Sequence, residues 1–362
     1  MDPVRIALSK NQFKGKERIL VQCGRLTASS FLYESGVHAV RLANEHGHII
    51  VLPYKGQQVW DAYFHGRYLN MDTMYAEPRN VTHFLDTYGC FVMHCGPLRM
   101  GCPGPEDNHT LHGDLPYGDY DEAALKVGRD AEGAYMGITG LYDYNRAFGE
   151  KYHARPMALL REGSSLVEVS IEIENYSHYP MDLMYMCHVN FRPVEGGRII
   201  QSVGWDKKSM KVRTAIPDHV EASAGFVDFL SRLEADPGLT QTIRAEDEYD
   251  PEIAFFVENP RVDAGGWSHY MQVLPDGSAD YIRYKPSELD HNTRWISRTQ
   301  DQKGLGLALP ATCDPEGYTA EKLKGNVKTV AGKSSVTFHA VAGYQNREEA
   351  AKMEETIKQL MR

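Results

Sequence analysis

The strongest constraint on the fold is an alternation of apolar and polar side chains between residues 164 and 175. The segment reads Ser-Ser-Leu-Val-Glu-Val-Ser-Ile-Glu-Ile-Glu-Asn, with apolar residues recurring at every second position. Because successive side chains of a strand point to opposite faces of a sheet, a period of two predicts a strand with one buried face. Several strands of this kind predict a sheet that packs its apolar face against another layer.

Other segments of the chain support a mostly β structure. We expect further strands over residues 36–42, 47–53, 181–191 and 335–342, and a turn at Asn44–Gly47 between the first two. Residues 346–362 predict an amphipathic helix with Ala350, Met353 and Ile357 on one face, and residues 121–130 a short helix. With no internal repeat and no linker, residues 1–362 predict a single all-β domain, a sandwich or barrel.

Composition excludes several functional classes. The 362 residues carry 39 basic and 49 acidic side chains, a net charge of −10, which argues against nucleic acid or an anionic membrane as the main partner. No apolar run is long enough to span a bilayer, and the N-terminus lacks the apolar core of a signal peptide. The six cysteines show no regular disulfide spacing. We therefore expect a reduced, soluble, cytoplasmic protein.

Two histidine segments are the clearest candidates for chemistry. Residues 107–116 place His109 and His112 among carboxylates, and His188 lies in a second segment, Cys187–Phe191. Imidazole can both donate and accept a proton near neutral pH, so two imidazoles brought together from separate strands would form a general acid/base pair. The competing interpretation of His188 is a hydrogen-bonded histidine of the core, because it lies on an apolar strand.

An ordered set of motifs resembles the galactose mutarotase-like superfamily, the aldose 1-epimerases, and within it the divergent DUF4432-type subgroup. The set extends over most of the chain and comprises Leu52–Asp61, His94–Gly96, Leu111–Pro116, Asn175–Phe191 and Gly306–Thr312. The resemblance implies a large antiparallel β-supersandwich with a sugar cleft on one concave face, to which the predicted helix at residues 346–362 adds a short C-terminal helix. It also implies a monosaccharide or small glycoside as substrate. A homodimer is left open.

The resemblance also implies roles for individual residues. Aldose 1-epimerases open and reclose the pyranose ring, using a carboxylate base and a histidine acid. Asn108 and His112 match the Asn-x-x-x-His-Gly spacing of the family, so His112 is expected to orient the substrate and His188 to act as the general acid. Further substrate contacts are expected from Arg99, Asn108, His109 and Trp295.

The sequence departs from the family at the base. Family members carry a glutamate before a proline near the C-terminus, whereas this chain has Ala308 and Leu309 before Pro310. An aliphatic side chain cannot accept a proton. We therefore expect a nearby carboxylate to replace it, with candidates Asp314, Glu316 and Glu321, of which Glu316 and Glu321 have the longer reach.

Two other functions remain open. A divalent metal bound near His94, His109 and His112 would polarise a carbonyl and remove the need for a glutamate base, which would suit a lyase or isomerase acting on an oxidised (keto) sugar. The spacing matches no standard zinc module, so the favoured hypothesis has no metal or other cofactor. The loss of the base would also suit a carbohydrate-binding protein without catalysis.

Overall fold

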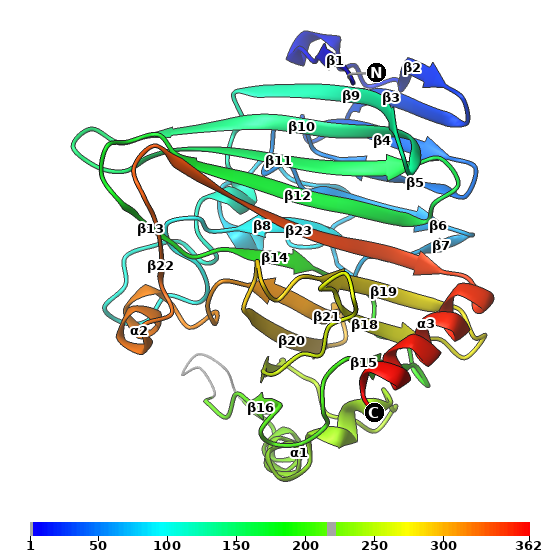
Figure 1. The fold of residues 1–362 in the computed structure, drawn as a ribbon, viewed down its shortest axis with the longest axis vertical. Coiled ribbons are helices and arrows are strands. Elements are labelled where there is room, and N and C mark those ends of the chain that lie inside the picture. Colours follow the sequence, from blue (N-terminus) through cyan, green and yellow to red (C-terminus); the bar gives the residue numbers. More distant parts are fainter. Residues whose placement is uncertain (1–2, 216–221) are drawn as a thin grey trace.

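Two large antiparallel sheets make up most of the computed structural model, which describes residues 3–215 and 222–362 (Figure 1). The nine-stranded sheet has the order β1 (Val4–Ala7), β9 (Glu122–Asp130), β10 (Gly133–Asn145), β11 (Lys151–Arg161), β12 (Leu166–Asn175), β23 (Ser334–Gln345), β19 (Ala279–Tyr284), β18 (Ser268–Val273) and β15 (Arg198–Gln201).

The twelve-stranded sheet lies against it. Its order is β16 (Met210–Val212), β17 (Ile253–Val257), β20 (His291–Arg298), β21 (Lys303–Ala311), β14 (Met186–Val189), β8 (Val92–Cys95), β6 (Val59–Phe64), β5 (Gly47–Val51), β4 (His38–Asn44), β3 (Leu26–Leu32) and β2 (Arg18–Cys23), with β7 (Arg67–Tyr68) paired to β6. A small separate sheet joins β13 (Met181–Leu183) to β22 (Lys328–Val330). The predicted antiparallel β-sandwich is confirmed.

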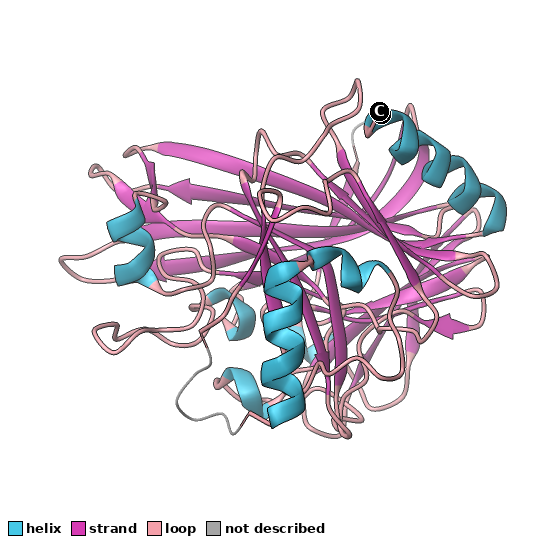
Figure 2. Cartoon of the chain, turned by 90° about the horizontal axis from the view of Figure 1, so that it is seen from below, coloured by secondary structure: helices cyan, strands magenta, loops and turns pink. Residues whose placement is uncertain are grey.

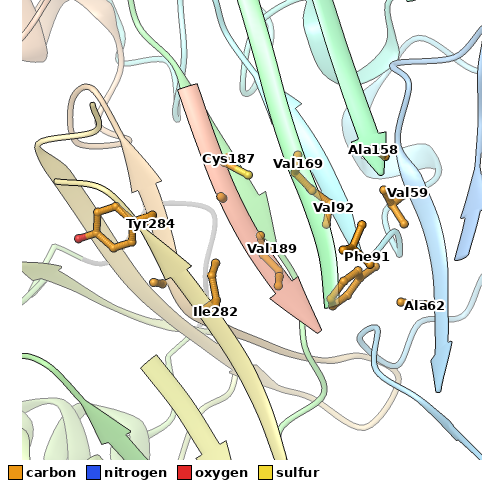
Figure 3. Close-up of a cluster of buried hydrophobic side chains, with 14 of the residues drawn as sticks. Val59, Ala62, Phe91, Val92, Ala158, Val169, Cys187, Val189, Ile282 and Tyr284 are labelled. Carbon is orange, nitrogen blue, oxygen red and sulfur yellow. The ribbon is translucent and has the colours of Figure 1, made fainter. Parts of the chain in front are cut away.

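The main core fills the space between the two large sheets. The apolar side chains that alternate along β12, from Val167 to Ile173, are buried there. Figure 3 shows Val169 of that strand close to Val92 and Val189 of the twelve-stranded sheet. The strands predicted over residues 36–42, 47–53, 164–175 and 335–342 correspond to β4, β5, β12 and β23, and the first two form a hairpin with its turn at Asn44–Gly47.

Two local predictions are wrong. The helix predicted over residues 121–130 is instead strand β9 (Glu122–Asp130), because β1 and β10 pair with it on both sides and supply the hydrogen bonds that a helix would have made internally. Residues 181–191 do not form one strand. Met181–Leu183 pairs with β22, and Met186–Val189 enters the twelve-stranded sheet between β8 and β21.

Helices lie on the outside of the two strand layers (Figure 2). The predicted C-terminal helix is α3 (Arg347–Leu360), which begins at a capping box on Asn346 and packs Ala350 and Ile357 against the outer face of the nine-stranded sheet. Helices α1 (Ala224–Ala235) and α2 (Tyr318–Lys324) were not predicted. Four short 3₁₀ helices complete the described secondary structure, η1 (Lys10–Gln12), η2 (Phe84–Asp86), η3 (Leu115–Tyr117) and η4 (Pro237–Gln241). No helix in the described ranges is long and apolar enough to cross a membrane.

The outer face of the twelve-stranded sheet carries a second apolar cluster, here called the outer-face cluster. Its buried members come from the strands of that sheet and from the segments that cover them, and they include Trp60, Met93, Cys95, Met186, Leu309, Phe84, Tyr88 and Tyr117. The segment between β7 and β8, which contains η2, and the segment that ends in η3 therefore lie over this face. The predicted histidines are found here.

Candidate active site

The pairing of β8 with β14 determines which histidines can meet. His188 lies opposite Met93 and Cys187 lies opposite His94 in this antiparallel pair. Directly opposed residues share a face of the sheet. Met93 belongs to the outer-face cluster, whereas Cys187 lies in the core between the sheets (Figure 3). His188 therefore faces outward and His94 inward.

His94 is consequently separated from the other predicted metal ligands. One of its ring nitrogens, Nδ1, lies 2.8 Å from the hydroxyl of Tyr185, a residue of the core between the sheets. The set His94, His109 and His112 is not brought together. Among residues 3–215 and 222–362, no group of three or more histidine, cysteine, aspartate or glutamate side chains is arranged to hold a metal ion.

A tight turn places His112 over the sheet. His112 has φ 59° and Gly113 has φ 82°, so both lie in the left-handed region, which a residue with a Cβ adopts at a cost. The N–H of His112 donates to the carbonyl of Gly101 at 3.0 Å, and the carbonyl of His112 accepts from Gly96 at 2.9 Å. A Cβ on Gly113 would lie 2.2 Å from the carbonyl oxygen of Arg99. The His-Gly step is therefore required by the close approach of the backbone.

His112 and His188 meet on the outer face. Their ring centroids are 5.5 Å apart and their planes cross at 84°. Trp295, half-buried on β20, packs edge-on against His188 at 5.9 Å. The Nδ1 atoms of both histidines are buried and have no hydrogen-bond partner in the described part of the chain. Buried polar atoms are seldom left unpaired in native proteins, and those that are often have a ligand or a catalytic role.

Burial keeps both imidazoles neutral at pH 7. Burial, and then the charge of nearby His109, lowers the pKa of His112 to about 4. Burial, followed by the proximity of His112, also lowers the pKa of His188 well below its ordinary value of 6.5. Strongly shifted pKa values of neighbouring groups are typical of functional sites.

Segment 84–88 covers the histidine pair. The ring of Phe84 lies 4.9 Å from that of His112, and the ring of Tyr88 lies 6.1 Å from that of His188. The hydroxyl of Tyr117 lies within hydrogen-bond reach of the carbonyls of Phe84 at 3.1 Å and Thr87 at 3.2 Å. These contacts hold segment 84–88 in place.

Comparison with known proteins identifies the family. The model of a domain of unknown function, DUF4432, matches residues 34–341 of the sequence. The chain belongs to the DUF4432 family. No curated protein matches the sequence.

Solved structures agree on the fold. A candidate aldose 1-epimerase from Klebsiella pneumoniae is similar with a TM-score of 0.79 at 17% identity, over 99% of this chain and 92% of that one. A galactose mutarotase-like protein from Clostridium acetobutylicum is similar with a TM-score of 0.59 at 14% identity, over 89% of this chain and 99% of that one. The DUF4432 chain thus has the galactose mutarotase-like fold.

Three of the residues predicted to contact substrate lie away from the pair or have other partners. Asn108 is exposed. Arg99 places its guanidinium 3.5 Å above the ring centre of Tyr318, at the start of α2, rather than beside the histidines. The side chain of His109 is only 7% exposed, and its Nδ1 donates to the carbonyl of Thr110 at 2.8 Å. Trp295, the fourth of these residues, packs against His188.

The carboxylates predicted to supply the base have structural partners. Glu321 is fully buried, and it accepts hydrogen bonds from the backbone N–H of Asp314 at 2.9 Å, the side chain of Asn326 at 2.7 Å and that of Lys324 at 2.7 Å. Glu316 pairs with the same lysine at 3.1 Å. The oxygens of Glu321 thus hold α2 to the preceding loop.

A different carboxylate lies beside the tryptophan. The indole Nε1 of Trp295 donates to Oε2 of Glu252 at 2.7 Å, and Oε1 of Glu252 lies 3.4 Å from the guanidinium of Arg213. Sequence reasoning missed Glu252 and Arg213. The Asp250-Pro251-Glu252 segment marks the start of a strand, but the contact with Trp295 depends on how β17 pairs with β20, which no local pattern reveals.

Proposed function

We propose that this DUF4432 protein is a sugar epimerase of the mutarotase type, which interconverts the anomers of a monosaccharide. The observation that carries the proposal is the convergence of His112 and His188 next to the half-buried ring of Trp295. Imidazoles with free Nδ1 atoms suit proton transfer, and an indole face suits the apolar face of a pyranose. Support also comes from the galactose mutarotase-like fold.

The reaction needs two proton transfers in each direction. In ring opening, the bond between C1 and the ring oxygen breaks, the anomeric hydroxyl loses its proton as the C1 carbonyl forms, and the ring oxygen gains a proton. His188 is the proposed donor to the ring oxygen, and His112 orients the sugar by hydrogen bonding. Ring closure on the other face of the carbonyl reverses these transfers and yields the other anomer.

The low pKa of His188 adds a requirement to this role. Because the free protein holds His188 neutral at pH 7, His188 must take up a proton before or during substrate binding. An anionic group on the far side of the sugar would favour the imidazolium through charge attraction and so reduce this cost.

The test is anomer interconversion measured by polarimetry or proton NMR across a panel of aldoses. His188→Asn should lower kcat by about a hundredfold or more, as expected for loss of a general acid. His339→Ala, which changes an exposed histidine on β23 of the other sheet, is the matched control and should keep full activity. Absence of mutarotation on every aldose by the unaltered protein would reject the proposal.

One observation favours a second candidate, an isomerase acting on an oxidised (keto) sugar. A neutral imidazole accepts a proton without first acquiring one, and a proton next to a carbonyl is acidic enough for such a base. Incubation of keto sugars in D₂O would reveal this activity as exchange of carbon-bound hydrogen for deuterium. Repeating the assay after dialysis against a chelator tests whether a metal contributes.

A further inference from the structure

We propose that Glu252 is the general base of this site and replaces the glutamate that the mutarotase pattern places on β21. This inference rests on the proposed function and names the group that removes the proton from the anomeric hydroxyl. It moves the base from the predicted segment 314–321 to the residue that precedes β17.

Strand pairing places Glu252 on the same face as the histidines. Ala254 of β17 lies opposite Trp295 of β20, so the two side chains share a face. Glu252 comes two residues before Ala254 and therefore continues on that face. The hydrogen bond between the indole of Trp295 and Glu252 confirms the direction of the side chain. Trp295 thus contacts the carboxylate with its N–H and the imidazole of His188 with its ring.

The usual base position is filled by an apolar side chain. Leu309 of β21 belongs to the outer-face cluster, and it pairs with Thr293 of β20. The neighbouring strand on the other side of β20 is β17. A carboxylate at the beginning of β17 therefore approaches the histidine pair across β20, whereas the family glutamate would approach from β21 itself.

Glu252 also has unused acceptor positions on its carboxylate, which a general base requires. Two ionised oxygens offer about four lone-pair positions. One is used by Trp295, and the contact with Arg213 at 3.4 Å is longer than a strong ion pair. The side chain is 38% exposed, so Glu252 is accessible to a ligand. Glu321, by contrast, is fully buried and already accepts hydrogen bonds from three donors.

The proton balance of the reaction closes with this pair. Glu252 takes the proton of the anomeric hydroxyl as the C1–ring oxygen bond breaks, and His188 gives its proton to the ring oxygen. The open-chain state then has a neutral Glu252 and a neutral His188, the form that burial favours for this imidazole. Ring closure returns the first proton to the carbonyl oxygen and the second to His188.

Glu252→Gln tests the assignment, because the amide oxygen still accepts the hydrogen bond of Trp295 but the side chain no longer accepts a proton. We expect kcat for mutarotation to fall by about a hundredfold or more, with KM within a few-fold and the melting temperature unchanged. Glu258→Gln, an amide substitution at the exposed carboxylate that follows β17 and pairs with Lys211, is the matched control and should keep wild-type kcat.

Rescue separates a base from a structural residue. Formate added to Glu252→Ala should restore part of the lost kcat in a concentration-dependent way, and it should leave His188→Asn inactive. Full activity of Glu252→Gln in a protein that catalyses mutarotation would overturn the role of Glu252 while leaving the proposed function in place. An unaltered protein that is inactive on all aldoses would overturn both.

Discussion

The ring planes of His112 and His188 stand almost perpendicular, at 84°, with their centres 5.5 Å apart. At this distance two imidazolium ions would repel each other strongly in a buried environment, whereas one proton on the pair is tolerated. The pair is therefore suited to holding no more than one proton at a time. Because the pair holds at most one proton, the effect of pH on activity can be measured separately from its effect on stability.

The first prediction concerns stability and pH. The unfolded His112 titrates near 6.5 and the folded one at about 4, so the unfolded chain binds more protons between these values. The stabilising effect of a neutral His112 is complete above pH 6.5, and it is lost as the pH falls towards 4. The loss is on the order of 3 kcal/mol for this residue. Urea unfolding of the wild type and of His112→Asn over this range should show a smaller pH dependence in the variant.

The second prediction concerns activity and pH. If His188 donates the proton, kcat should rise as the pH is lowered from 8 towards 5, because the protonated fraction of a group with such a low pKa grows about tenfold per pH unit. The measurement is the mutarotation rate at saturating sugar, made where circular dichroism shows the protein to be folded. A kcat that falls over the same range would instead indicate that the pair accepts a proton, as in the keto-sugar isomerase.

The third prediction separates function from folding at the turn. Asparagine adopts the left-handed conformation more easily than histidine, so His112→Asn should leave the melting temperature unchanged or slightly raised while mutarotation falls at least tenfold. Gly113→Ala is the contrasting variant. Its Cβ would collide with the carbonyl of Arg99, so it should lower the melting temperature and the activity together. A strongly destabilised His112→Asn would show that the imidazole serves the fold.

The fourth prediction concerns the cover. Removing the aromatic ring in Phe84→Ala should open a path to His112, which it contacts at 4.9 Å. Diethyl pyrocarbonate should then modify His112 several-fold faster than in the wild type, as followed by peptide mass spectrometry. Leu85→Ala changes the exposed neighbour in η2 and is the control, for which no acceleration is expected. Equal modification rates in all three proteins would mean that segment 84–88 does not limit access.

Local sequence patterns correctly predicted those strands and helices whose buried face is set by their own contiguous residues. The alternation along β12 and the amphipathic face of α3 are properties of contiguous residues, and both were confirmed. Residues 122–130 contain alanine, leucine and lysine, which favour helix, but pairing with β1 and β10 overrides that preference. Where neighbours decide the structure, the local sequence is a weak guide.

In the candidate site, too, some residues could be predicted from the local sequence, whereas others depend on strand pairing. The His-Gly step and the histidine of β14 could be found because each lies in a recognisable segment. Glu252 could not, since its place beside Trp295 follows from the register of β17 on β20, between residues some forty positions apart. Likewise, the inward direction of His94 follows from the register of β8 on β14.

Strand β14 has only four residues, and they serve both sides of the sheet. Cys187 and Val189 point into the core, while Met186 and His188 point to the outer face. A slip of one residue along β8 would exchange the two sets, turning the imidazole of His188 into the core between the sheets and the side chains of Cys187 and Val189 towards the outer face. The direction of His188 therefore depends on the packing of its two neighbours in the core. Substitutions that loosen the packing around Val189 are expected to appear in functional screens as loss of turnover before any loss of folded protein is detected.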